Sequence, residues 1–521
     1  MNQLSEKNGT TVLSVLTDSS LSKVFARCIT FVLLIALMVT RNAQDMAERM
    51  FWLNETYEFV VATRSFWEIP VLTIKFWIMQ PPLFYWLGHV VAKIGTDPLT
   101  LRSISLLLSI AMIGFVIFGL RELKFASRVF LSFVLIMSPF GAFATTAFRP
   151  YALAALSILV SSVFFLRALQ QPSKWSSAIL YGISALALQY SLTLNCFTFG
   201  LQMSCLGIIL VRGVQREGLK QTLVEYKPLI IVCIPLNIAY ALVLTMIMQT
   251  GLRFFQPPPF DLDAYVKALL KNAVQIKENI VLLRSWALSF GPACFLLGAI
   301  YGLRRNVPVT AYLLVLFGGQ LLFSTYMTYS RLEYFGVRYL VASYVAFALL
   351  SAIGAEYIFQ RLDRKTSMLI VACLLVTTLP GGIIQYASSL NTPAFNPIKQ
   401  AIETMRCDNH PTVVLSDPWR NNYVPWFAYR DDPLLVVPTQ KKLNKSIPTD
   451  SISRGAAEKH CFILIEGPQH NIYKGKIYDI LSALPGYTVE KHSITPGKVI
   501  PDFAWLFTPV SVDIKKGRTN R

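Results

Sequence analysis

Residues 41–102 read RNAQDMAERMFWLNETYEFVVATRSFWEIPVLTIKFWIMQPPLFYWLGHVVAKIGTDPLTLR, and this stretch is the most informative part of the chain. It follows a first hydrophobic segment but is too polar to cross a bilayer, because it contains Asp45, Glu48, Glu55, Glu58 and Glu68. It is also rich in Trp, Tyr and Phe, which gather where a protein meets the water–lipid boundary. The stretch therefore predicts a large loop that returns to the membrane surface.

The composition places the rest of the chain in the membrane. Of 521 residues, 54% are hydrophobic and 15% are charged, with a mean hydropathy of +0.49, whereas soluble domains carry roughly a quarter charged residues. A membrane span needs about 20 apolar residues. We predict an α-helical polytopic membrane protein with eleven spans: 24–40, 101–120, 127–146, 150–167, 175–192, 194–211, 229–249, 285–303, 308–327, 339–358 and 367–387. The break between the spans 175–192 and 194–211 is the weakest of them.

The distribution of Lys and Arg predicts the orientation of the spans. Basic residues gather in alternate loops, and such loops face the cytoplasm. They include Lys23, Arg27, Arg121, Lys124, Arg128, Arg167, Lys174, Arg212, Arg216, Lys220, Lys227, Arg304, Arg305, Arg361, Arg364 and Lys365. The N-terminus is then cytoplasmic and the C-terminus lies outside. The net charge of +19 reflects this bias rather than a nucleic-acid partner.

The remaining segments complete the expected organisation. A polar N-terminal tail (1–23) precedes a membrane domain (24–390), whose large outside loops are 41–100 and 250–284. Short apolar runs alternate with helix-like pieces over 391–510, which predicts a small α/β domain outside the membrane before a basic tail (511–521).

Several shorter features sharpen these boundaries. The segments 66–79 and 81–93 suit interfacial helices, and an amphipathic helix is expected over 265–278. Cys407 and Cys461 lie in the outside domain, where an oxidising compartment permits a disulfide, and the sequence leaves open whether they pair.

The acidic residues restrict where outside chemistry can occur. Between Pro98 and Phe260 the acids are Glu122, Glu217 and Glu225, and all three fall in predicted cytoplasmic loops. An outside carboxylate in the membrane domain must therefore come from one of the two large outside loops.

A series of short motifs carries a resemblance to a known family. The sequences are WLNE at 52–55, PPLFYWL at 81–87, DPLTLR at 97–102 and FRPYAL at 148–153. In this order, over about residues 20–390, the chain resembles the GT-C-fold glycosyltransferases of family 39, which include protein-mannosyltransferase-like and aminoarabinose-transferase-like enzymes. The resemblance implies transfer of a sugar from a polyprenyl-phosphate donor to a lipid, glycan or protein acceptor on the outer face of the membrane.

The resemblance also implies a catalytic carboxylate in the first outside loop. Family members carry Trp-Leu-Asp-Glu after the first span, but here the first acid is replaced by Asn54. An amide cannot take a proton from an acceptor hydroxyl. We therefore rank Glu55 first as the base, and Asp45 and Glu58 as its alternatives.

Two further departures concern a metal. Family members often have His or Lys where this chain has Gln80, and an acid where it has Ala147. Gln80 can still hydrogen-bond a substrate. A Mg²⁺ or Mn²⁺ ion prefers clustered carboxylates, so a divalent cation is an open expectation and we assign no metal ligand.

The leaving phosphate of such a donor calls for arginine, whose planar fork binds phosphate bidentately. Arg149 and Arg338 are the main candidates, with Arg331 and Arg253 as further outside arginines, and snorkelling to lipid headgroups is the alternative role. Several aromatic residues either line the sugar and prenyl groove or anchor the chain at the interface: Tyr57, Tyr85, Tyr151 and Tyr339.

The sequence thus favours an inverting membrane glycosyltransferase, expected in a bacterial inner membrane with its C-terminal domain in the periplasm. A transporter or lipid flippase is the alternative from another class. Transporters often carry ionisable residues in mid-membrane and two similar halves, and neither feature is evident in this sequence. A catalytically inactive relative that binds lipid-linked sugar is a third possibility, motivated by Asn54, Gln80 and Ala147.

Overall fold

The structure is a computed structural model that divides into two compact units. The first comprises residues 1–46 and 65–385, and the second comprises 47–64 and 386–521. The structure describes residues 11–48, 53–75, 80–251, 261–276, 286–329, 340–363, 365–370, 373, 402–407, 410–417, 435–436, 449–466, 476–493 and 503–510.

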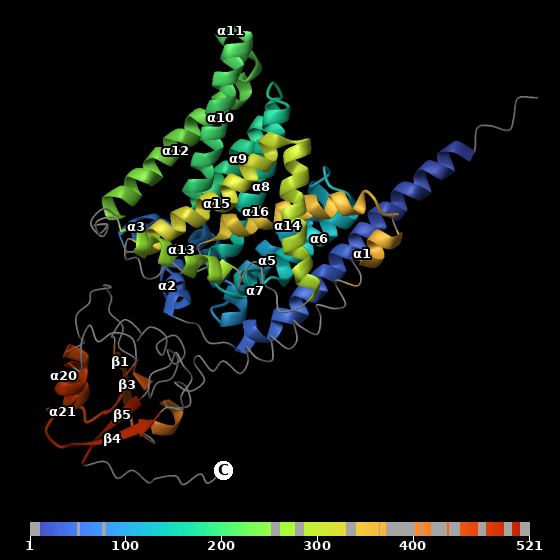
Figure 1. Cartoon of the computed structure of the whole chain (residues 1–521). Coiled ribbons are helices and arrows are strands. Elements are labelled where there is room, and N and C mark those ends of the chain that lie inside the picture. Colours follow the sequence, from blue (N-terminus) through green and yellow to red (C-terminus); the bar gives the residue numbers. More distant parts are fainter. Residues whose placement is uncertain are drawn as a thin grey trace, which may run out of the picture. The chain divides into compact units, whose positions relative to one another are not determined.

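The first unit is built from helices (Figure 1). They are α1 (Thr11–Glu48, in this unit up to Met46), α3 (Glu68–Lys75), α4 (Leu83–Ala92), α5 (Pro98–Gly114), the π-helical turn η1 (Phe115–Gly119), α6 (Phe125–Met137), α7 (Pro139–Thr146), α8 (Tyr151–Gln170), α9 (Trp175–Ser191), α10 (Asn195–Glu217), α11 (Leu219–Glu225), α12 (Lys227–Gly251), α13 (Leu262–Ile276), α14 (Trp286–Arg305), α15 (Val307–Tyr329) and α16 (Val341–Phe359).

Six helices among the described residues are long and apolar enough to cross a membrane, and two bent helix pairs raise this number to eight. Together with the composition, they make the chain an integral membrane protein. The expected spans from 24–40 to 339–358 fall on described helices, and α9, with 17 residues, is a short one. The expected span 367–387 lies almost wholly outside the described residues, so a count of eleven stays a prediction.

The expected span 127–146 is a bent pair rather than one straight helix. α6 ends at Met137, and the segment after it turns by 68°. Ser138 begins α7 by accepting a hydrogen bond from the backbone N–H of Gly141 at 2.9 Å, and a proline follows at the first helical position. A hydroxyl cap followed by proline starts a new helix rather than continuing the old one.

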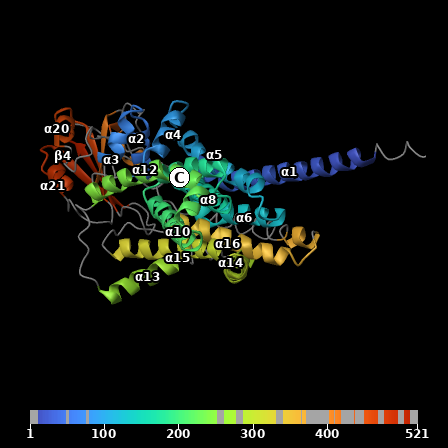
Figure 2. The ribbon, with the colours of Figure 1, turned by 90° about the horizontal axis from the view of Figure 1, so that it is seen from above.

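The core of the first unit lies around α6 and α16. Every residue from Ala126 to Met137 is buried. In the most apolar stretch of α16, 83% of the residues are buried, whereas in that of α1 only 11% are buried. A helix that is apolar all round packs inside a bundle, so α6 and α16 are central and the span of α1 is peripheral. Figure 2 shows α13, α14, α15 and α16 gathered on one side of the bundle, where they pack against one another.

Helices α14 and α16 approach each other closely at two glycines. A Cβ atom on Gly298 would overlap the carbonyl oxygen of Leu350, and one on Gly354 would overlap that of Cys294. Ser351 adds a hydrogen bond across the pair, from its Oγ to the Gly291 carbonyl at 3.1 Å. Small residues that let backbones touch are a common way to hold helices together in lipid.

We expect Gly354→Ala to destabilise the protein by about 1–3 kcal/mol, because the added methyl group forces α14 and α16 apart. The matched control is Gly207→Ala on α10, where an added Cβ meets nothing within 4 Å. Thermal unfolding in detergent measures both variants. An unchanged midpoint for Gly354→Ala would contradict the close packing.

Uncharged polar side chains join four helices inside the first unit. Gln202 of α10 is fully buried, and its Oε1 accepts a hydrogen bond from the Tyr181 hydroxyl of α9 at 3.1 Å. Its Nε2 donates to the Tyr312 hydroxyl of α15 at 3.2 Å and to Ser161 Oγ of α8 at 3.1 Å. Such bonds fix how membrane helices pack without placing a charge in the bilayer.

The loop after η1 is fixed by an ion pair. Arg167 Nε lies 2.6 Å from Glu122 Oε1, and Arg167 Nη2 bonds the Gly119 carbonyl at 2.7 Å. Burial raises the pKa of Glu122, but the hydrogen bond and charge of Arg167 outweigh this and leave the pKa below its ordinary value. The pair therefore stabilises the fold at neutral pH, and its contribution falls as acid protonates Glu122. Because the pair is partly exposed, the contribution is small.

The second unit contains a mixed five-stranded sheet in the order β2-β1-β3-β5-β4. β1, β2 and β3 run parallel, while β5 is antiparallel to β3 and to β4. Its elements are α2 (Leu53–Ala62), β1 (Thr412–Asp417), β2 (Leu435–Val436), α20 (Thr449–Ala457), β3 (Cys461–Glu466), α21 (Lys476–Ser482), β4 (Tyr487–Ser493) and β5 (Phe503–Pro509). The three parallel strands fall on the apolar runs 412–415, 434–437 and 461–465 of the sequence, as expected for a small α/β domain.

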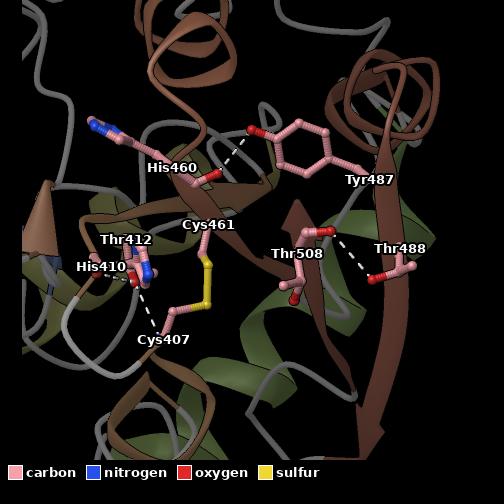
Figure 3. Close-up of a disulfide and its surroundings, with 8 residues drawn as sticks. All are labelled: Cys407, His410, Thr412, His460, Cys461, Tyr487, Thr488 and Thr508. Carbon is pink, nitrogen blue, oxygen red and sulfur yellow. Dashed lines mark hydrogen bonds between the residues drawn. A yellow bond between two sulfur atoms is a disulfide. The ribbon is translucent and has the colours of Figure 1, made fainter. Parts of the chain in front are cut away.

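A disulfide between Cys407 and Cys461 closes the start of β3 onto the segment before β1 (Figure 3). Beside it, the backbone N–H of Cys407 donates to Thr412 Oγ1 at 3.3 Å, and the Tyr487 hydroxyl donates to the His460 carbonyl at 2.9 Å. The sequence left this pairing open. Disulfides persist in oxidising compartments.

We expect Cys407→Ser to lower the stability of the second unit, because the bond spans 54 residues and a loop of that length contributes about 4 kcal/mol in the chain-entropy description. Cys28→Ser, which removes a free exposed cysteine of α1, is the control. The midpoint of thermal unfolding, with and without reductant, measures the effect. Equal midpoints under oxidising conditions would contradict it.

Candidate functional site

Arg149 lies in a tight turn between α7 and α8. The turn is closed by its own backbone, since the Arg149 N–H donates to the Ala147 carbonyl at 2.8 Å. Pro150 then fixes the direction in which α8 begins at Tyr151. The sequence FRPYAL therefore places one arginine at the junction of two helices.

The Arg149 side chain is 5% exposed and is held by Tyr151. Its Nη2 donates to the Tyr151 hydroxyl at 3.1 Å, and the guanidinium lies 5.4 Å from the centre of the same ring. Tyr151 itself packs against Phe143 of α7, with ring centres 5.5 Å apart. A planar guanidinium held in one orientation is well suited to bind two oxygen atoms of an anion such as phosphate.

Helix α4 covers the turn from a second side. Phe84 packs against Phe148, with ring centres 5.3 Å apart, and both side chains are fully buried. Tyr85, the next residue of α4, is also fully buried. The helix begins after the proline pair, as the sequence predicts, and Gln80 lies immediately before that pair.

Gln80 is half-buried, and its Oε1 is buried with no hydrogen-bond partner among the residues that the structure describes. A buried amide oxygen without a partner is unfavourable. A hydroxyl-bearing ligand would provide the missing donor.

Helix α5 contacts the segment that leads into this turn. Ser105 donates to the Ala147 carbonyl at 2.6 Å, and Ser109 lies 3.0 Å from Thr145 Oγ1. One turn earlier, the fully buried Arg102 donates from Nη1 to the Met46 carbonyl at 3.0 Å, near the end of α1. A cation at a helix C-terminus satisfies carbonyls that have no partner within the helix.

The acids that sequence analysis ranked lie in the second unit or at the end of α1. Glu55 and Glu58 sit three residues apart on α2, and both side chains are fully buried. Residues at this spacing share one face of a helix. The pair is thus a concentrated source of carboxylate in a segment that sequence analysis expected to be a loop.

The other sequence candidates are placed only in part. Asp45 lies on α1, and Asn54 and Tyr57 lie on α2, but their side chains fall outside what the structure describes. Arg253, Arg331, Arg338 and Tyr339 lie outside the described residues altogether. Their roles stay predictions.

No group of three or more His, Cys, Asp or Glu side chains that could hold a metal occurs in the described part of the chain. The residue at the family's acidic position, Ala147, is fully buried and caps α7 with its backbone.

Comparison with solved structures places the fold. ArnT of Cupriavidus metallidurans bound to undecaprenyl phosphate matches with a TM-score of 0.54 and 10% sequence identity, over 93% of this chain and 98% of its own. The same protein in the apo state matches with a TM-score of 0.53 and 12% identity, over 95% and 99%. An Archaeoglobus fulgidus oligosaccharyltransferase gives a weaker likeness, with a TM-score of 0.47 and 14% identity, over 91% and 73%.

The chain has the GT-C fold. The likeness to ArnT extends over both units, so the GT-C fold expected from the short motifs is confirmed at the level of architecture. No known family matches the sequence, and no curated protein matches it. Membership of family 39 and a mannosyltransferase-like specificity therefore stay hypotheses.

The sequence does not single out the polar residues of α5. Arg102 ends the motif DPLTLR, but the motif does not predict its bond to α1, and Ser105 and Ser109 resemble ordinary residues of an apolar span. The available signal was spacing, because residues 102, 105 and 109 recur on one helical face.

Proposed function

We propose that this GT-C chain is a membrane glycosyltransferase that takes a sugar from a polyprenyl-phosphate donor and passes it to an acceptor outside the cytoplasm. The observation that carries the proposal is the fold, shared over 93% of the chain with an ArnT structure that holds undecaprenyl phosphate. The buried Arg149, positioned at a helix junction, supplies the type of group that such a phosphate requires.

The proposed reaction inverts the configuration at the anomeric carbon of the sugar. The acceptor hydroxyl gives its proton to a carboxylate, Glu55 by preference, and its oxygen forms the new bond to that carbon. The bond from the carbon to the donor phosphate breaks, and the electron pair stays on the phosphate oxygen. Arg149, together with Arg338 in the undescribed segment, stabilises the charge that develops on the leaving polyprenyl phosphate.

The other proposed residues bind rather than react. Gln80 lies before α4, Tyr85 lies on α4, and Tyr151 orients Arg149. In this proposal all three contact the sugar or the donor phosphate. Asn54, Tyr57 and Tyr339 stay candidates for the same groove. A Mg²⁺ or Mn²⁺ ion is not required by this scheme, because arginine supplies the positive charge.

The membrane and its orientation follow from the same proposal. The positive-inside bias places the second unit outside the cytoplasm, and the disulfide supports an oxidising compartment such as the bacterial periplasm. The acceptor is then a lipid, a cell-surface glycan or a protein on that side. We propose that the membrane is a bacterial inner membrane.

An assay with purified protein tests the proposal. Undecaprenyl phosphate carrying radiolabelled sugars is supplied in detergent with a lipid and glycan extract as acceptor. We expect label to move into the acceptor as free undecaprenyl phosphate appears. Transport of the lipid across vesicles without release of its sugar would indicate a flippase, and binding without turnover would indicate an inactive relative.

A further inference from the structure

Three buried polar side chains follow one face of α5, a helix that is mostly apolar. Arg102, Ser105 and Ser109 occupy positions i, i+3 and i+7, and all three are buried. Arg102 contacts the end of α1, whereas Ser105 and Ser109 both contact the end of α7. An arginine is rare inside a membrane helix and is normally paired, and buried serines hydrogen-bond to neighbouring helices.

Ser105 is the residue of this face that contacts the Arg149 turn. Ala147 is the C-cap residue of α7. Its carbonyl oxygen accepts two hydrogen bonds, from Ser105 Oγ at 2.6 Å and from the Arg149 N–H at 2.8 Å. The same carbonyl thus fixes the turn to α5 and fixes Arg149 within the turn. Movement of Ala147 would move the Arg149 guanidinium with it.

Arg102 fixes α5 itself. Its bond to the Met46 carbonyl ties the helix to the end of α1, and the Asp97 side chain caps the start of α5 by accepting from the Thr100 N–H at 2.9 Å. One turn beyond Ser105, Ser109 contacts Thr145 of α7 at 3.0 Å. The Ser105 hydroxyl is therefore a donor at a fixed place, between two other attachments of the same helix.

We propose that Ser105 is a positioning residue, which holds the Arg149 guanidinium where it meets the donor phosphate. This rests on the proposed function. Ser105 acts through the Ala147 carbonyl and does not touch the donor. Its loss leaves the charge of Arg149 in place but loosens its position, and small displacements of a binding group carry large penalties in affinity and rate.

The test compares Ser105→Ala with Ser103→Ala. Ser103 is on the same helix but donates only to its own helix, at the Thr100 carbonyl. Titration with undecaprenyl phosphate, kinetics with the sugar-loaded donor and thermal unfolding are measured for each variant. For Ser105→Ala we expect roughly tenfold weaker binding and a raised KM for the donor, with the unfolding midpoint close to wild type. Ser105→Thr, which keeps the hydroxyl, is expected to restore both.

The outcomes separate the two proposals. Ser105→Ala with wild-type binding and KM, in a protein whose Arg149→Ala variant binds weakly, overturns the positioning role and leaves the proposed function intact. Equal losses in Ser105→Ala and Ser103→Ala, or losses that follow the unfolding midpoint, also overturn it. Wild-type protein that binds no undecaprenyl phosphate overturns the proposed function itself.

Discussion

Arg149→Ala is expected to lower sugar transfer by on the order of 10²–10³-fold, the loss seen when one preorganised donor to a developing anion is removed. The guanidinium is buried at the junction of α7 and α8 and is oriented by the Tyr151 hydroxyl at 3.1 Å. Alanine removes the charge, whereas Tyr151→Phe removes only one orienting bond. We therefore expect a smaller loss for Tyr151→Phe.

The control is Arg64→Ala, because Arg64 is an exposed arginine. We expect it to keep wild-type activity. Arg149→Lys keeps a positive charge but loses the planar fork, so an intermediate loss is expected. Folding is checked by thermal unfolding, since Arg149 is also a packing residue. A folded Arg149→Ala protein with full activity would remove Arg149 from the phosphate site.

The second large effect is expected for Glu55→Gln, which keeps the shape of the side chain but cannot accept the acceptor's proton. General bases contribute about 10²–10⁴-fold to rate, so we expect a loss in kcat of that order with little change in the KM of the donor. Glu58→Gln removes the neighbouring carboxylate on the same face of α2 and is expected to cause a smaller loss.

Glu68→Gln is the matched control. Glu68 is an exposed acid of the same sequence stretch, and its carboxylate accepts a hydrogen bond from the Ser65 N–H at 3.4 Å. We expect wild-type kinetics for this variant. Full activity of folded Glu55→Gln would show that Glu55 is not the base, and a complete loss confined to Glu58→Gln would transfer the role to Glu58.

The sequence predicts where the described long apolar helices lie, because their composition identifies them. The sequence does not predict the break at Ser138, because the apolar run continues on both sides of the serine–proline pair. In the second unit the parallel strands appear as short apolar runs. Neither β4 (Tyr487–Ser493) nor β5 (Phe503–Pro509) is among the predicted apolar runs; in β4, Glu490, Lys491 and His492 interrupt the apolar pattern.

The candidate site is predicted only in its local parts. Arg149 and Tyr151 stand together in one motif, so sequence alone finds them and the structure joins them. The bond from Ser105 reaches a residue 42 positions away, and that from Arg102 reaches one 56 positions away. Pairings at such separations are set by how helices pack, and one sequence does not reveal them.

Native mass spectrometry of the purified protein with undecaprenyl phosphate is the most direct measurement of the central claim, that this GT-C fold binds a polyprenyl phosphate at Arg149. We expect one lipid molecule bound to the wild type and to Arg64→Ala, and binding at least roughly tenfold weaker in Arg149→Ala, a change that corresponds to about 1.4 kcal/mol. Equal binding by all three proteins, or no binding by the wild type, would contradict it.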